Sequence, residues 1–350
     1  MNARDFGQAE TGSAAGTARP ADEQMPFDVS VVVPTYGRPL LLGTCLDALA
    51  AQDFDAARYE IIVCDDGPDD ATRAAVERFA QQCASARGLA VRYLPVTATQ
   101  GPAGARNAGW RAARSPLIAF TDDDTIPDPH WLTAGVDALR SGADAASGAI
   151  AMPLSDAPTD YELDASGLAR SEFATANAFV RRATLAALGG FDERYTSAWR
   201  EDSDLQFAIL QTGGRIVRAE QALVVHPVRP ARWGVSLSQQ KKSQFEALLY
   251  RKHPELYRQR IDAMPPLRYY AIVASLLCAG IAALAGQALI AALALALWIA
   301  LTTAFCVRRL RHTRRDPMHV AEMAWTSMLI PFLSIYWRLR GALRYKVFFL

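Results

Sequence analysis

Residues 117–124 read Leu-Ile-Ala-Phe-Thr-Asp-Asp-Asp, an apolar run that ends in three consecutive carboxylates. The apolar part predicts a buried strand, and the aspartates follow at its carboxyl end. Because crowded carboxylates repel one another, we expect a positive charge beside them. Carboxylate oxygens suit Mg²⁺ and Mn²⁺, and open α/β sheets bind ligands at the carboxyl ends of their strands. The stretch therefore predicts a site for Mg²⁺ or Mn²⁺ at one edge of such a sheet.

Short apolar runs alternate with helical stretches in the sequence before this site. The predicted strands are 29–33, 61–64, 91–94 and 117–120, and the predicted helices are 40–51, 71–87 and 103–113. Apolar strands separated by helices are typical of a parallel sheet that is covered on both faces and connected by right-handed crossovers. We therefore predict an α/β fold with a mostly parallel, Rossmann-like sheet and helices on both faces.

The charge of the chain is balanced overall but unevenly distributed. The formal net charge is +1, which does not suggest a nucleic-acid partner. From Arg308 to the C-terminus, however, there are nine Lys or Arg and two Asp or Glu, as in tails that lie against anionic lipid. The five cysteines show no CxxC spacing, so we expect reduced thiols in a cytosolic compartment. Residues 1–25 lack an apolar core and predict a disordered lead, not a signal peptide.

The segment 269–307 contains no Asp, Glu, Lys or Arg. A single straight helix of this length would measure about 58 Å, against about 30 Å for the hydrocarbon core of a bilayer. Two spans that turn near Gly286 fit better. Basic residues flank both ends of the segment, namely Arg268, Arg308, Arg309, Arg311, Arg314 and Arg315. A transmembrane hairpin with both flanks in the cytoplasm satisfies the positive-inside rule, whereas the alternative is a buried helical pair in a soluble domain.

The apolar segment 320–337 is interrupted by Glu322 and Pro331. A third span would carry the following basic residues outside, against the charge rule, so we predict an interfacial helix. We thus divide the chain into the lead, a catalytic domain at 26–267 and a membrane region at 268–350.

Polar residues follow the first two predicted strands directly. The turn Pro34-Thr35-Tyr36-Gly37-Arg38 places Thr35 and Arg38 where they can meet the polar groups of a nucleotide. The second strand ends in Asp65-Asp66-Gly67, whose carboxylates can accept hydrogen bonds from a base or ribose, or can cap the next helix. Neither motif is specific by itself.

Two further motifs point to a phosphate and a cation. The segment 100–109 contains Gly101, Arg106 and Asn107 at a predicted helix start, where glycine allows close backbone approach and arginine can face a diphosphate. Asp122 and Asp124 have the DxD spacing that lets both side chains point the same way in extended backbone. The alternatives are a tightly packed Gly/Ala helix start and three solvated turn carboxylates.

Acidic residues recur after Trp199. Glu201 and Asp202 are suited to one catalytic base and one supporting contact, although acids at a helix start also complement its dipole. His226 follows an apolar run and could complete the metal shell through a neutral imidazole, although a lone histidine after a strand is more often structural.

In this order, the motifs resemble those of family-2 glycosyltransferases with the GT-A fold. The matching elements are Val-Pro-Thr-Tyr, Asp-Asp-Gly, Gly-x-x-x-Ala-Arg-Asn, Asp-x-Asp, Gly-Gly-Phe-Asp-Glu and Glu-Asp, over about residues 27–235. The resemblance implies inverting transfer of a sugar from a nucleotide-diphosphate donor to a hydroxyl of a lipid or glycan acceptor. With the predicted hairpin, it places the enzyme at the inner membrane with its catalytic domain in the cytoplasm.

The resemblance also implies roles for individual residues. Asp66 would contact the base, Asp122 and Asp124 would serve the ribose and the metal, and Asp202 would be the general base, with Glu201 beside it. The expected donor-binding residues are Pro34, Thr35, Tyr36, Arg38, Asp65, Asp66, Gly101, Arg106, Asn107, Asp122 and Asp123. The expected metal ligands are Asp122, Asp124 and His226, and Trp199 and Trp233 are expected at the acceptor.

Two departures from the family pattern limit these expectations. Pro68 replaces the Ser that usually follows Asp-Asp-Gly, and Arg229 replaces Gln in the Gln-x-x-Arg-Trp motif of processive members. The second departure favours a single transfer over polymer synthesis. The alternatives are a nucleotidyltransferase, which would need a Gly-rich basic loop after the first strand, and a catalytically inactive, membrane-anchored binding or scaffold protein.

Overall fold

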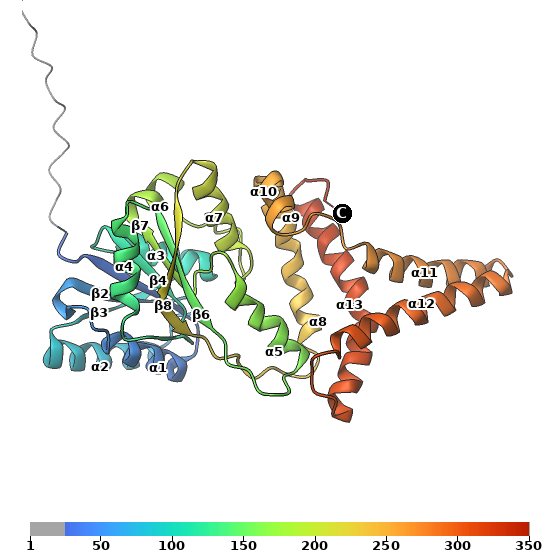
Figure 1. The fold of residues 1–350 in the computed structure, drawn as a ribbon, viewed down its shortest axis with the longest axis horizontal. Helices are drawn as coiled ribbons and strands as arrows, with labels where there is room; N and C mark the ends of the chain where they lie inside the picture. Colours follow the sequence, from blue (N-terminus) through green and yellow to red (C-terminus); the bar gives the residue numbers. More distant parts are fainter. Residues whose placement is uncertain (1–24, 350) are drawn as a thin grey trace, which may run out of the picture.

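A computed structural model describes residues 25–349, which leaves almost all of the predicted lead outside the described part (Figure 1). The described chain forms one sheet of eight strands in the order β3-β2-β1-β4-β7-β6-β8-β5. The strands are β1 Val29–Thr35, β2 Tyr59–Asp65, β3 Ala90–Pro95, β4 Leu117–Thr121, β5 Ile126–Pro127, β6 Ala145–Ala151, β7 Asn177–Arg181 and β8 Ile216–Val225.

Strands β1 to β4 form the parallel half of the sheet, as the alternating pattern predicts. The connecting helices are α1 Pro39–Ala50, α2 Asp70–Arg87 and α3 Pro102–Ala112. Val31 and Val33 belong to one core cluster and Val32 to another, because successive side chains of a strand point to opposite faces. The sheet is therefore buried on both faces, which explains the continuous apolar runs.

Antiparallel pairs make the second half of the sheet mixed. Strand β7 lies antiparallel between β4 and β6, and β5 pairs antiparallel with β8. The helices of this half are α4 Trp131–Arg140, α5 Asp160–Ala165, α6 Arg182–Leu188 and α7 Glu201–Gln211. The pairing of β5 with β8 aligns Ile126 with Val225 and so joins the turn after β4 to the end of β8.

Helices make up most of the chain after β8. They are α8 Val235–Gln239, α9 Gln244–Lys252, α10 Pro254–Arg260, α11 Leu267–Leu284, α12 Ala288–Arg309 and α13 Pro317–Arg344. Helices α11 and α12 form a hairpin that projects from the body of the protein (Figure 1). Its turn contains Gly286 at φ +71°, a conformation that glycine adopts without strain, at the predicted place.

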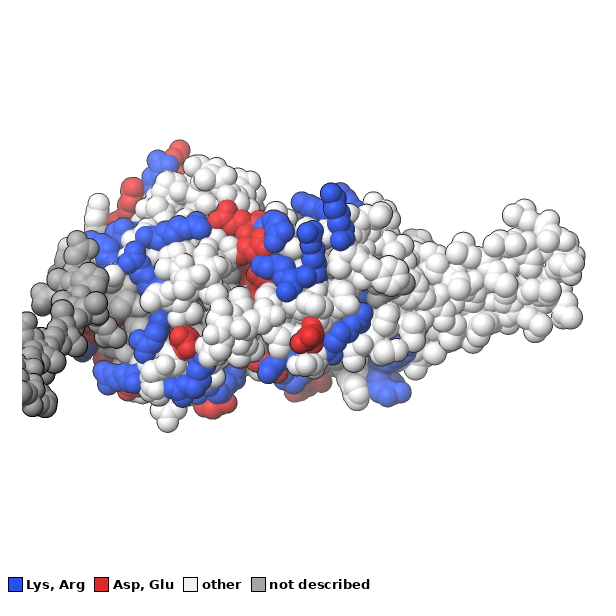
Figure 2. All heavy atoms as spheres, turned by 90° about the horizontal axis from the view of Figure 1, so that it is seen from above, with Lys and Arg blue, Asp and Glu red and all other residues white. Residues whose placement is uncertain are grey.

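The hairpin is apolar and mostly exposed. Helices α11 and α12, of 18 and 22 residues, are long and apolar enough to cross a membrane, at about 27 and 33 Å. Figure 2 shows the projecting hairpin free of charged side chains and blue basic side chains on the body near its base. Leu277, Leu284 and Leu293 are 58%, 92% and 63% exposed, which is costly in water.

The chain after the hairpin returns to the body of the protein. Helix α13 packs against α9, and it continues through Pro331 to Arg344. Tyr345 and Phe349 lie in a core cluster with Tyr195 and Phe207 of the preceding domain. The last residues thus complete a core that begins near α7, although they follow the predicted boundary at residue 268.

We predict that Phe349→Ala lowers the free energy of unfolding by about 3–5 kcal/mol, as for other buried aromatic side chains. Phe349 is 1% exposed, whereas its neighbour Phe348 is 84% exposed and provides a matched control. Denaturant unfolding in detergent would measure both. Equal stabilities of the Phe349→Ala and Phe348→Ala variants would contradict the placement of the chain end in the core.

Candidate active site

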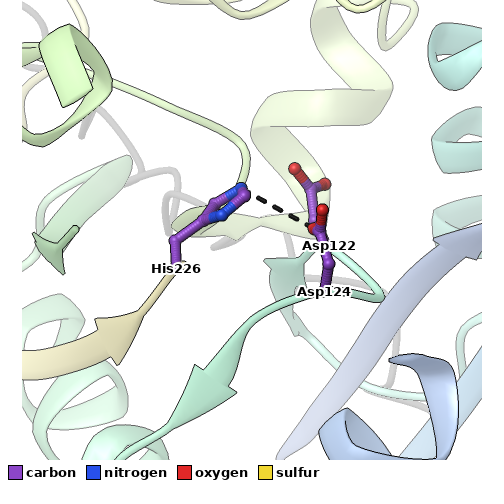
Figure 3. Close-up of side chains that lie close together, drawn as sticks. All are labelled: Asp122, Asp124 and His226. Atoms are coloured by element: carbon purple, nitrogen blue, oxygen red, sulfur yellow. Dashed lines mark ion pairs between the residues drawn. The ribbon is translucent and has the colours of Figure 1, made fainter. Parts of the chain in front are cut away.

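The structure brings the three predicted metal ligands together. Asp122 and Asp124 lie in the turn after β4, and His226 follows β8 directly. Because β5 pairs with β8, this turn lies beside the end of β8, and one ligand atom from each residue lies within 4.8 Å of the others. Figure 3 shows the side chains converging from the two strand ends. Two carboxylates and an imidazole form a donor set that can hold a divalent cation.

Positive side chains surround Asp124, whose side chain is 5% exposed. Its Oδ2 lies 3.0 Å from Nε of Arg229 and 3.8 Å from a guanidinium nitrogen of Arg38, and its Oδ1 lies 3.6 Å from Nε2 of His226. Oδ2 has no hydrogen bond of good geometry to any described residue. A buried carboxylate oxygen without such a partner is free to ligate a cation, so the residues fit a metal ion.

Arg106 connects the metal-ligand cluster to the second acidic motif. Its guanidinium, 3% exposed, donates to Asp122 at 2.8 Å and to Glu201 at 3.1 Å. Burial raises the pKa of Asp122, but the charge and the hydrogen bond of Arg106 outweigh it and leave this pKa below its usual value. We expected Arg106 to face a diphosphate, yet both of its partners are carboxylates of the protein. In the structure Arg106 thus joins the two acidic motifs, and its contact with a donor diphosphate stays a prediction.

Glu201 and Asp202 begin helix α7. Glu201 is buried against Arg106, whereas the side chain of Asp202 accepts from the N–H of Ser203 at 2.7 Å and is partly exposed. Burial and the neighbouring Asp202 raise the pKa of Glu201 to about 7, and burial also raises the pKa of Asp202. A partly exposed carboxylate with a raised pKa is suited to accept a proton from a bound group.

The turn after β1 is anchored to the aspartate cluster. Buried Asp123 accepts from the hydroxyl of Thr35 at 2.7 Å and pairs with Arg38 at 2.8 Å, and burial raises its pKa to about 6. Pro34 is buried within β1, and Tyr36 is 63% exposed. Of these expected donor-binding residues, Tyr36 and Arg38 are accessible, whereas Asp123 and Thr35 hold the two strand ends together.

Asp65 and Asp66 have different surroundings. Asp65 is fully buried and accepts from the N–H of Gly67 and the hydroxyl of Tyr93, so it shapes the turn and has no exposed oxygen. Asp66 is partly exposed, and both of its carboxylate oxygens accept from the N–H of Gly101 at 2.8 Å. Gly101 has φ +112°, which favours glycine at this contact. Asp66 therefore remains accessible, whereas Gly101 is buried beneath it.

Asn107 is 1% exposed, and its polar atoms are all used within the protein. Its amide donates to the carbonyl of Phe191 and to Glu193, and its oxygen accepts from the N–H of Phe191 and from the indole of Trp110. The structure thus gives Asn107, expected to touch the donor, a role in fixing the Gly-Gly-Phe-Asp-Glu loop against α3.

The two expected acceptor residues are accessible. Trp199 is 36% exposed and donates to Glu246 at 2.7 Å, and Trp233 is 51% exposed. Glu246 also pairs with Arg200 at 2.9 Å and so fixes the turn before α7, in which Arg200 has φ +74°. No sequence motif marked Glu246, and Arg229 stood out only as a departure from a motif, not as a partner of Asp124.

Comparisons with known proteins identify the family of the chain. The family described as Glycosyl transferase family 2 matches residues 30–184, and Glycosyl transferase family group 2 matches residues 117–337. Glycosyltransferase AglE of Haloferax volcanii is 27% identical over 218 residues, which cover 59% of this chain and 68% of the relative. Validoxylamine A glucosyltransferase of Streptomyces hygroscopicus is 35% identical over 105 residues, 30% of this chain and 24% of that relative.

A solved structure shares the fold. Mannosyltransferase PcManGT from Pyrobaculum calidifontis, in complex with GDP-Man and Mn²⁺, has a TM-score of 0.60 and 23% identity, and the match covers 89% of this chain and 86% of that chain. The Glycosyl transferase family group 2 match alone spans more than half of this chain. The protein is therefore a member of glycosyltransferase family 2, and its catalytic sheet has the GT-A fold.

Proposed function

We propose that the protein transfers one sugar, with inversion, from a nucleotide-diphosphate sugar to a hydroxyl of a lipid or glycan acceptor. The observation that carries the proposal is the convergence of Asp122, Asp124 and His226 next to Glu201 and Asp202, with Arg106 joining the two groups. Sugar transfer needs both groups of residues. The first must hold the diphosphate of the donor, and the second must remove a proton from the acceptor hydroxyl.

The donor would lie along the carboxyl ends of β1, β2 and β4. Asp66 and Tyr36 line this edge and are accessible to the nucleoside, and Arg38 carries a positive charge within the same turn. Asp122, Asp124 and His226 would hold Mg²⁺ or Mn²⁺, and the mannosyltransferase that shares the fold was solved in complex with Mn²⁺. The cation would supply charge stabilisation for the departing diphosphate.

Asp202 would act as the general base. Its partly exposed carboxylate can accept the proton of the acceptor hydroxyl while that oxygen attacks the anomeric carbon. Glu201 lacks this freedom, because Arg106 holds it in a buried ion pair. Attack from the side opposite the leaving diphosphate inverts the anomeric carbon, and this route needs no covalent enzyme intermediate.

We further propose that α11 and α12 cross the inner membrane as a hairpin with the catalytic domain in the cytoplasm. Their length, composition and exposure support this, as do the basic residues at the base of the hairpin. Helix α13 contacts α9, and Phe349 packs with Tyr250 of α9 and Tyr257 of α10, so both ends of the hairpin belong on one side. This return favours two spans over three, with α13 lying at the membrane surface.

A catalytically inactive scaffold and a nucleotidyltransferase are less well supported. A scaffold has no need for a partly exposed carboxylate beside a buried Glu–Arg–Asp chain, since burying charge is costly unless each group is paired. A nucleotidyltransferase would need a Gly-rich basic loop directly after β1, where this chain has Pro34-Thr35-Tyr36-Gly37-Arg38 instead.

The Asp124→Asn variant should lose Mn²⁺-dependent binding of nucleoside diphosphates. The substitution removes a charge from the proposed cation site, whereas Asp70→Asn removes one from a fully exposed side chain and serves as control. Thermal shifts of the full chain with several nucleoside diphosphates, with and without Mn²⁺, measure this effect. Metal-dependent shifts of equal size in both variants would refute the metal site.

The Asp202→Asn variant should still bind donor and metal but transfer sugar about 10²–10⁴-fold more slowly, the usual contribution of a general base. Glu201→Gln should cost less transfer, since Glu201 positions Arg106 and does not take the proton. Single-turnover transfer separates the two. Near-normal transfer by Asp202→Asn together with loss in Glu201→Gln would assign the base to Glu201.

Charged residues in the middle of both hairpin helices should release the protein from membranes. Leu277 and Leu297 are 58% and 52% exposed, and an arginine at the centre of a span costs about 2.5–3.5 kcal/mol. We expect the Leu277→Arg/Leu297→Arg variant to be lost from the membrane fraction after alkaline carbonate extraction. The Leu277→Ala/Leu297→Ala variant should be retained, and release of the unchanged chain would exclude a spanning hairpin.

A further inference from the structure

The turn before α7 has an unfavourable backbone conformation directly beside the proposed base. Arg200 lies in the left-handed region at φ +74°, which residues other than glycine rarely adopt. Its carbonyl accepts the first helical hydrogen bond of α7, from the N–H of Asp204 at 2.8 Å, and Glu201 and Asp202 follow it in the chain. Such a conformation persists only when its surroundings fix it. The direction of the Asp202 side chain therefore depends on the contacts that hold Arg200.

Glu246 of α9 holds this turn through two side chains. Its Oε1 accepts from Nε1 of Trp199 at 2.7 Å and from Nε of Arg200 at 2.9 Å. Glu246 is 5% exposed, and its charge is neutralised by the guanidinium of Arg200. Hydrogen bonds between charged groups are strong when they are shielded from water. One buried carboxylate oxygen thus fixes both of the residues that precede Glu201.

Helix α9 contacts the first turn of α7 at a second place. Lys252, at the end of α9, donates to Asp204 at 2.6 Å, and Nε2 of the following His253 lies 3.1 Å from the same carboxylate. Asp204 is 3% exposed, so this contact is buried as well. Helix α9 and the residue after it therefore hold α7 on both sides of Asp202, two residues before it and two residues after it.

Helix α13 in turn holds α9 by close backbone packing (Figure 1). A Cβ on Gly341 would lie 2.3 Å from the carbonyl oxygen of Gln244 and 2.9 Å from its Cα, closer than a side chain allows. Gln244 is the first residue of α9, two residues before Glu246. Near the other end of α9, Arg251 donates to the carbonyl of Tyr345 at 2.6 Å. The chain after the hairpin therefore fixes the position of Glu246.

We propose that Glu246 is a positioning residue for sugar transfer, which holds the turn at Trp199 and Arg200 and thereby sets the direction of the Asp202 carboxylate. The inference rests on the proposed transferase function, in which Asp202 is the base. Because Glu246 is buried, it acts through the turn and not by contact with a substrate. Since α13 holds α9, the base is correctly placed only when the chain after the hairpin has packed against α9.

Amide hydrogen exchange of the full chain tests the contact without any substrate. Glu246→Leu removes the acceptor at similar size, whereas Glu246→Gln keeps an oxygen that can accept from both residues. We expect faster exchange over residues 199–204 in Glu246→Leu and nearly unchanged exchange in Glu246→Gln. Glu255→Leu removes the same charge from an exposed position of α10 and should leave this exchange unchanged. Equal exchange over 199–204 in all these variants and in the unchanged chain would overturn the proposal.

Transfer kinetics test whether the turn matters for the base. Incorporation of radiolabelled sugar from saturating GDP-mannose or UDP-glucose into membranes that contain the full chain measures the rate of transfer. We expect Glu246→Leu to transfer about 10²-fold more slowly, as for a catalytic group that is displaced by about 1 Å, and Glu246→Gln to recover most of the rate. The Mn²⁺-dependent thermal shift with nucleoside diphosphates should stay the same in both variants.

Three results of these measurements would each overturn the positioning role. The first is normal transfer by Glu246→Leu, which would make the turn irrelevant to the base. The second is an equal loss of transfer in Glu246→Leu and Glu246→Gln, which would assign the effect to charge and not to the hydrogen bonds. The third is a loss of the nucleotide shift in parallel with transfer, which would show general damage to the domain.

Gly341→Ala tests the same role from α13. The added methyl group has no room beside Gln244, so α9 and α13 must move apart and displace Glu246. We expect transfer to fall about tenfold while the nucleotide shift stays unchanged. Gly280→Ala adds the same group to α11, where nothing lies within 4 Å of it, and should transfer normally. Normal transfer by Gly341→Ala would refute the dependence of the base on α13.

Failure of this inference and failure of the proposed function give different results. The unchanged chain might transfer no sugar from any nucleotide sugar tested, while exchange over 199–204 still depends on Glu246 as expected. In that case the transferase assignment fails, and Glu246 remains the residue that orders the turn. Normal transfer by the unchanged chain, together with normal exchange and normal transfer in Glu246→Leu, refutes the positioning role alone.

Discussion

The ion pairs of Arg106 are the constraint on which the rest of the site depends. This buried guanidinium from α3 is shared by Asp122 after β4 and Glu201 at the start of α7, segments that are far apart in the sequence. A buried charge is tolerated only when its partners stay in place, and removing one partner typically costs about 3–5 kcal/mol. The position of Asp122 relative to the start of α7 is therefore built into the stability of the fold.

A second constraint is the short pairing of β5 with β8. Strand β5 has only two residues, yet its pairing with β8 brings the turn that contains Asp124 beside His226, which follows β8 directly. Carboxylate and imidazole thus meet through backbone hydrogen bonds, while Asp123 ties the same turn to β1 through Thr35 and Arg38. The aspartates are held on three sides before any ligand binds, which reduces the ordering cost of binding one.

Sequence reasoning succeeded where the signal was local. The apolar runs predicted β1 to β4, and the carboxylates predicted after β4 do lie together with His226, because strand ends and charge crowding are visible in a few residues. It did not foresee that Asn107 and Asp65 face inward, since burial depends on contacts with distant segments. The partnership of Arg229 with Asp124 and the return of Phe349 to the core likewise depend on tertiary packing.

The return of the chain end has a consequence for biosynthesis. Phe349 follows the hairpin in the chain, yet it packs with Tyr250 and Tyr257, which precede the hairpin, in the core cluster that includes Phe207 of α7. The sheet can form early, but the core beside α7 stays open until α11, α12 and α13 have been made. Completion of the catalytic domain must then wait for synthesis of the hairpin, so a chain released early exposes an unfilled aromatic core to chaperones and proteases.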